Sequence, residues 1–143
     1  MKKIMNFIML GLSLNIIEYI LLYIFYLIEG FVLYSVPKAI INGALRDANE
    51  ISLARFVFYF IFWVIAMNLF YNKINIKHPI LKMAVINCGL YILLCVLMTL
   101  IFPGAIEFFG RSFFFFLVIS TFLSPFIVDK IPMVSSVLRN INK

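Results

Sequence analysis

One stretch constrains this chain more than any other: residues 4–35 form an almost unbroken apolar run with a carboxylate, Glu18, deep inside it. A run longer than the roughly 20 residues that cross bilayer hydrocarbon is typical of a membrane helix. Lys2 and Lys3 precede the run, as in a signal peptide, but the run is longer than such a segment and no small-residue cleavage site follows it. We therefore expect a retained first membrane helix.

Three further apolar runs follow, and the composition agrees with a membrane protein. Hydrophobic residues make up 65% of the 143 residues and charged residues only 13%, whereas a soluble domain is about one quarter charged. We predict a single all-α integral membrane domain, an antiparallel up-and-down four-helix transmembrane bundle. Its crossings are expected at about residues 6–35, 54–71, 80–102 and 112–128.

The segment between the first two crossings has a different character. Apolar Ile40, Ala44 and Ala48 recur at helical spacing, while charged Arg46, Asp47 and Glu50 fall between them. This pattern predicts a short amphipathic helix over residues 38–50, lying at the membrane interface. An irregular polar loop is the alternative.

The carboxyl end, residues 131–143, repeats this pattern with basic charge. Val134, Val137 and Ile141 form an apolar stripe opposite Arg139. We expect a basic amphipathic tail with Arg139 at the interface.

The basic residues predict the orientation. Eight of them fall at the amino end, between the second and third runs, and at the carboxyl end: Lys2, Lys3, Lys73, Lys77, Lys82, Lys130, Arg139 and Lys143. The other four are Lys38, Arg46, Arg55 and Arg111. Because positive charge is retained on the cytoplasmic side, both termini are expected to be cytoplasmic in a bacterial inner membrane.

Glu18 is the first candidate for a functional residue. A charge at the centre of a membrane helix costs about 2.5–3.5 kcal/mol, so this acid should face other helices and be protonated or partnered. Asn15 lies one turn earlier, and Asn87 and Tyr91 are spaced four residues apart on the third run. We expect Glu18, Asn87 and Tyr91 to meet in a polar network, which is either a proton, ion or substrate site or a set of bonds that holds helices together.

Ser120 and Ser124 form a second candidate feature, on the fourth run. Small residues four apart allow another helix to approach closely, so this pair is expected to pack against a helix, including one from a partner protein. Pro125 should kink the same helix and free the carbonyl of Thr121, which the Thr121 hydroxyl is expected to satisfy.

Several classes of function are disfavoured. The basic residues form no patch, so nucleic acid is not an expected partner. Cys88 and Cys95 are seven residues apart and His78 stands alone, so no metal site is expected. The sequence contains no HExxH, GxSxG or phosphate-loop motif. We therefore expect neither an enzyme nor a cofactor.

Phe7, Gly11 and Asn15 in the first run, and Asn68 near the end of the second, resemble scattered positions of the GtrA-like family of small membrane proteins. That resemblance implies translocation of sugars linked to polyprenyl phosphate. The charged insert at residues 37–50 and the lack of an Asn-Arg-aromatic ending of the crossings depart from the family pattern.

These features favour a non-enzymatic subunit or accessory factor of a membrane complex, which acts through helix–helix contacts. Its expected partners are the lipid bilayer and either further copies of the chain or other membrane proteins. The alternative is a small oligomeric transporter or channel that uses Glu18 as its site. A phage-type pore former or a toxin-immunity protein would share this size and layout.

Overall fold

The computed structural model describes residues 2–33, 37–101 and 112–141, and these ranges fold into helices without a strand. In chain order the elements are α1 (Lys2–Leu33), α2 (Pro37–Phe70), the short 3-10 helix η1 (Tyr71–Lys73), α3 (Pro79–Ile101), α4 (Ser112–Val128) and α5 (Pro132–Ile141). Helices α2, α3 and α5 begin with proline, which suits the first helical position because the N–H that it lacks would have no helical acceptor there. The expectation of an all-helical chain is confirmed.

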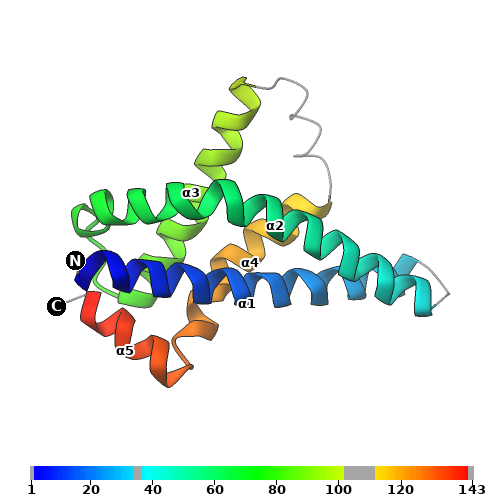
Figure 1. Ribbon diagram of the computed structural model, residues 1–143, viewed down its shortest axis with the longest axis horizontal. Coiled ribbons are helices and arrows are strands. Elements are labelled where there is room, and N and C mark those ends of the chain that lie inside the picture. The colour runs from blue at the N-terminus through cyan, green and yellow to red at the C-terminus, as the bar shows by residue number, and fades with distance from the viewer. Residues whose placement is uncertain (1, 34–36, 102–111, 142–143) are drawn as a thin grey trace.

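Helix α1 is the element against which most of the others pack. It lies antiparallel to α2 along the longest axis of the molecule, and it also contacts α4 and α5 (Figure 1). Helices α3 and α4 pair with each other and run obliquely across the α1–α2 pair. The two pairs are therefore not aligned with each other, as they would be in a simple up-and-down bundle. Helix α5 returns to the amino end of α1 and packs against that helix (Figure 1).

The structure corrects the break that the sequence suggested between residues 50 and 54. Residues 37–70 form one continuous helix, neither a separate interfacial helix nor an irregular loop. The physical reason lies in Ile51, Ser52 and Leu53, because no glycine or proline is present there to end a helix. The polar and apolar halves of α2 thus belong to one continuous helix, with Ala44 and Ala48 buried in its first half.

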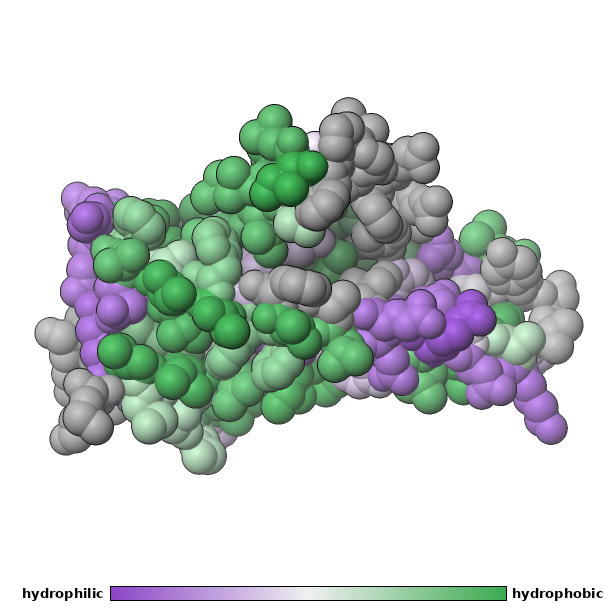
Figure 2. Space-filling view, turned by 45° about the horizontal axis from the view of Figure 1, so that its top comes forward, coloured by the Kyte–Doolittle hydropathy of each residue, from purple (hydrophilic) through white to green (hydrophobic). Residues whose placement is uncertain are grey.

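Two of the described helices, α1 and α3, are long and apolar enough to cross a membrane. Buried residues make up only 11% and 22% of their most apolar windows, so most of this apolar surface faces outward. Helix α4 is also apolar but has 17 residues. In Figure 2 a broad apolar area separates hydrophilic residues at the left end from those on the right.

The aromatic face of α2 forms part of the core. Its residues at four-residue spacing, Tyr59, Trp63, Met67 and Tyr71 in α2 and η1, are all buried. Phe7 of α1 contacts the rings of Trp63 and Tyr71 edge-on, with centroids 6.4 and 5.8 Å apart. Gly11 allows this close approach, since a Cβ there would lie 3.0 Å from Trp63 and 2.9 Å from Phe60.

Candidate functional site

The Glu18 carboxylate lies where α1 meets α3 and α4. Its Oε1 atom accepts a hydrogen bond from Asn87 Nδ2 at 2.8 Å and another from Ser124 Oγ at 2.8 Å. Glu18 and Asn87 are each 1% exposed, and Ser124 is fully buried. The sequence predicted that Glu18 and Asn87 would meet, and the structure places them in direct contact. We call Glu18, Tyr59, Asn87 and Ser124, with the carbonyl of Thr121, the Glu18 network.

Pro125 shapes the α4 side of this network. Because proline has no N–H, the carbonyl of Thr121 four residues earlier loses its helical donor. Asn87 Nδ2 donates to that carbonyl at 2.8 Å. The Thr121 hydroxyl instead donates to the carbonyl of Val118 at 2.8 Å. The expectation that Thr121 satisfies its own carbonyl is thus wrong: the donor comes from α3.

Helix α2 contributes Tyr59 to the network. The Tyr59 hydroxyl lies 2.8 Å from the backbone carbonyl of Asn87 and 3.0 Å from its Oδ1, so one proton is shared between two acceptors. This contact fixes the Asn87 amide with its oxygen toward Tyr59 and its nitrogen toward Glu18. The ring of Tyr91 packs edge-on against Tyr59, with centroids 5.8 Å apart. The described contacts of Tyr91 thus place it behind Tyr59.

The network joins four helices through one carboxylate oxygen and one amide. Asn87 alone bonds to groups on α1, α2 and α4. Hydrogen bonds to a carboxylate are stronger than those between neutral groups, and the low exposure keeps water from competing. This arrangement orients and fixes the helices.

Other predicted residues lie outside the network. Asn15 donates to the carbonyl of Gly11 in its own helix at 2.8 Å. Ser120 is fully buried and donates to the carbonyl of Leu117 at 2.9 Å. Since Ser120 and Ser124 are both enclosed by the chain itself, the expectation that this pair meets a partner protein is wrong. The side chain of Arg139 lies outside the described residues.

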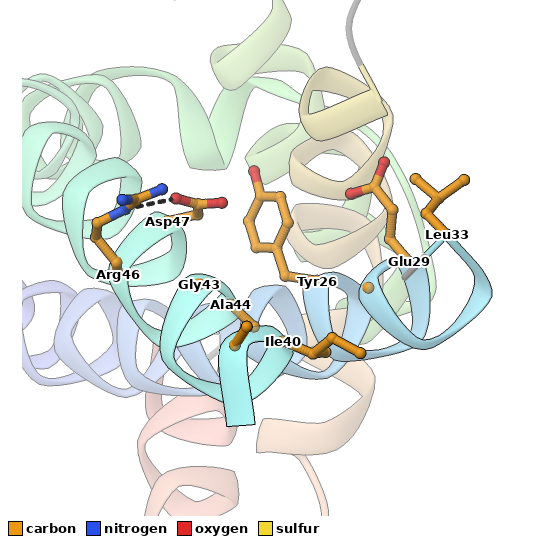
Figure 3. A pocket seen from close by; sticks show the side chains of 10 residues that line it. Tyr26, Glu29, Leu33, Ile40, Gly43, Ala44, Arg46 and Asp47 are labelled. Carbon is orange, nitrogen blue, oxygen red and sulfur yellow. Dashed lines mark hydrogen bonds and ion pairs between the residues drawn. The ribbon is translucent and has the colours of Figure 1, made fainter. Parts of the chain in front are cut away.

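A second polar site lies between the carboxyl half of α1 and the amino half of α2. It is an open cavity of about 530 Å³ (Figure 3). The lining residues are Tyr26, Glu29, Gly30, Leu33, Ala39, Ile40, Gly43, Ala44, Arg46 and Asp47. Arg46 Nε lies 3.3 Å from Asp47 Oδ1, and both side chains are largely open to the surroundings. We call this the Tyr26 cavity. Glu50 follows on the same helix and is exposed.

Sequence reasoning missed the part of Tyr59 in the network, the donor to the carbonyl that Pro125 frees, and the Tyr26 cavity. The spacing of Thr121 and Pro125 marked a freed carbonyl, but the identity of its donor depends on how α3 is rotated. At one point of the cavity wall α1 and α2 touch closely, since a Cβ on Gly30 would lie 2.5 Å from Ile40. No spacing in the sequence indicates such a contact.

Within the described ranges, no group of three or more His, Cys, Asp or Glu side chains could hold a metal ion. The two cysteines in α3 are not joined by a disulfide. A comparison of the chain with protein-family models, curated protein sequences and solved structures gave no match.

Proposed function

We propose that the chain is a four-span integral membrane protein that acts as a non-enzymatic accessory subunit, through contacts of its helices with another membrane protein or a second copy. The observation that carries this proposal is the distribution of polarity. The buried polar groups of the Glu18 network bond to one another, whereas large apolar side chains cover the outside of α1, α2, α3 and α4. Lipid and apolar helices are the surroundings that suit such an exterior.

The positions of the basic residues support the proposed orientation. Lys3 lies 5.8 Å from the centre of the Phe7 ring, and Lys82 lies 4.3 Å from that of Tyr71. Since Phe7 and Tyr71 pack against each other, the amino end of α1 and the start of α3 share one end of the molecule. The last turns of α5 approach the same end (Figure 1). This is the end that the positive-inside rule assigns to the cytoplasm.

A groove between α2 and α3 is the surface we assign to the partner helix. Its volume is about 480 Å³, and it is almost wholly apolar. It is lined by Phe62, Ala66, Phe70, Lys73, Ile74, Val85, Ile86, Gly89, Leu90 and Leu93. A Cβ on Gly89 would meet nothing within 4 Å. Ala66 and Gly89 therefore leave room for the backbone of a second helix, which is how membrane helices associate closely.

The test is copurification in mild detergent, followed by the mass of the complex. Gly89→Leu should fill the groove without a clash inside the chain and release the partner. Gly43→Leu is the matched control, because a Cβ on Gly43 also meets nothing within 4 Å but lies in the Tyr26 cavity. A wild-type chain that purifies only as a monomer, or a complex that Gly89→Leu leaves intact, contradicts the proposal.

A second candidate is an oligomeric ion-coupled carrier or channel that uses Glu18. It is favoured by the position of this carboxylate at the junction of four helices, since acids inside membrane spans often mark ion pathways. Glu18→Gln keeps an acceptor oxygen for Asn87 and Ser124 but cannot carry a charge. The carrier is favoured if the wild type transports protons or other ions into proteoliposomes and Glu18→Gln abolishes this transport without a change in helical content. Unchanged flux, or none in the wild type, would exclude this use of Glu18.

A further inference from the structure

One stripe of α2 is left largely uncovered by the other described helices. Its members follow each other at alternating spacings of three and four residues, and residues so spaced line one side of a helix. Four of the five are exposed, and the fifth, Ser52, is partly buried. We call this stripe the α2 seam: Asn42, Leu45, Asn49, Ser52 and Phe56. Its spacing is that of the contact line between two helices, and its exposure shows that the second helix is not supplied by the described chain.

The seam borders a groove of about 350 Å³ between α1 and α2. Asn49, Ser52 and Phe56 line this groove from α2, and Leu12 and Ile16 line it from α1. The two α1 side chains are 40% and 61% exposed. A second helix that lies on the seam would cover these side chains as well, so the contact would extend over both α1 and α2.

The amides of this groove have unused hydrogen-bonding capacity. Tyr19 donates its hydroxyl to Asn49 Oδ1 at 2.9 Å, and none of the described residues accepts from the Asn49 N–H groups. Asn15 Nδ2 donates to the carbonyl of Gly11 at 2.8 Å, and none of the described residues donates to Asn15 Oδ1. The surface therefore offers donors from α2 and an acceptor from α1. Bilayer hydrocarbon can satisfy neither.

Ser52 is an independent observation at the same groove. Its Oγ atom is buried and has no hydrogen-bond partner among the described residues. Ser13 and Ser120, by contrast, each donate to a carbonyl of the preceding turn. A buried hydroxyl without a partner costs free energy, and a rotation about the Cα–Cβ bond of Ser52 would turn this hydroxyl into the seam. The unpaired hydroxyl therefore points to a contact that the single chain lacks.

We propose that a second copy of the chain binds along the α2 seam, with the two α2 helices parallel and Asn49 of both copies at the two-fold axis. Two copies enter a membrane in the same orientation, so their two-fold axis lies along the membrane normal and equivalent residues face each other across it. An asparagine amide both donates and accepts, so Asn49 can bond to its own equivalent. A single polar asparagine on such a contact line specifies the register and the number of helices.

The hydrogen-bonding groups support a second copy over an unrelated helix. Each copy brings the unused N–H donors of Asn49 and the unused acceptor of Asn15, so the paired surface is complementary to itself. Hydrogen bonds between polar side chains and close packing are what hold membrane helices together. This inference rests on the membrane orientation proposed above, and it adds a contact surface separate from the groove at Gly89.

Disulfide crosslinking of the full chain in proteoliposomes tests the arrangement. Asn49→Cys should crosslink to the same position of the second copy under a mild oxidant, because equivalent residues meet at the axis. Leu45→Cys keeps the Asn49 amide and should crosslink as well. Glu50→Cys and Asn68→Cys, at exposed positions of α2 outside the seam, are the matched controls and should stay monomeric. If the two seam variants stay monomeric, or crosslink no faster than the two controls, the proposal is overturned.

The dimerisation equilibrium measures the contribution of the amide. Asn49→Ala should weaken the dimer about threefold, which is the value of one hydrogen bond between membrane helices. Asn68→Ala should leave the affinity unchanged. Energy transfer between labelled chains, diluted stepwise with lipid, gives the three affinities. Equal affinities of the wild type and both variants overturn the proposal.

Gly89→Leu separates this contact from the groove assigned to the partner helix. The crosslink at residue 49 should persist in the double variant Asn49→Cys with Gly89→Leu. If Gly89→Leu abolishes the crosslink at unchanged helical content, the second copy lies in the groove and the proposal is overturned. A crosslink that persists while no other protein copurifies supports the seam and counts against the accessory role alone, so the two proposals can fail separately.

Discussion

Two acids on the same face of α1 have opposite surroundings. Glu18 and Glu29 are eleven residues apart, which is about three helical turns. At Glu18, helices α2, α3 and α4 all contribute bonds to the network, and the acid is 1% exposed. At Glu29 the neighbouring wall is the polar half of α2, and the space between remains an open cavity. The number of helices that converge determines whether a polar face becomes a closed junction or an open site.

The closed junction should be most sensitive to Asn87. Asn87→Leu removes the donor to both Glu18 and the Thr121 carbonyl, and leaves a buried acid with a partner missing. We expect a loss of about 3–5 kcal/mol in the free energy of unfolding, measured by helical circular dichroism in mixed micelles. Asn68→Leu, at an exposed asparagine of α2, is the control. A double variant with Glu18→Leu should recover part of the loss, and equal effects at Asn68 and Asn87 would contradict the buried network.

Two glycines compare the close contact between α1 and α2 at Gly11 with the open cavity at Gly43. Gly11→Ala places a methyl group against Phe60 and Trp63, and should cost about 1–3 kcal/mol through overpacking. Gly43→Ala meets open space and should stabilise the helix by about 0.5–1 kcal/mol. Unfolding of the two variants in the same micelles measures both values. If both changes stabilise, the close contact at Gly11 is wrong.

The two serines of α4 allow the contribution of a hydrogen bond between helices to be compared with that of a hydrogen bond within one helix. Ser124→Ala removes a donor to Glu18 and should cost about 1–2 kcal/mol. Ser120→Ala removes only a bond to a carbonyl of its own helix and should change stability by less than about 0.5 kcal/mol. Thermal unfolding of the pair compares them directly. A larger loss at Ser120 would show that the packing at this position outweighs the network.

The smallest effect is expected at the open site. Glu29→Gln should change the free energy of unfolding by less than about 0.5 kcal/mol, because a half-exposed charge contributes little. The same change at Glu18 introduces an amide N–H where water is excluded and should cost more. Chemical unfolding of both variants measures the difference. Equal losses would remove the distinction between the two acids.

The sequence predicted the meeting of Glu18 and Asn87 well, because helical spacing and the cost of an acid among apolar residues both pointed to the same faces. It could not predict Tyr59 or the bond from Asn87 to the Thr121 carbonyl, since these depend on the rotation of α3 relative to α2 and α4. The change from alternating polar and apolar residues to an apolar run at residues 51–53 resembled the boundary between two elements. The helix continues there because these residues include no glycine or proline to end it. The Tyr26 cavity depends on how α1 and α2 pack against each other, which periodicity does not encode.

The order of synthesis gives the Glu18 network a further consequence. The ribosome makes Glu18 first, and Ser124 follows 106 residues later. At about 5–20 residues per second, roughly 5–20 s pass before the last donor emerges. In the proposed four-span topology, α1 must therefore enter the bilayer before Ser124 can donate to its acid, or wait beside an insertase until α4 arrives. In the proposed topology, the synthesis of α4 is thus the step that completes the surroundings of Glu18.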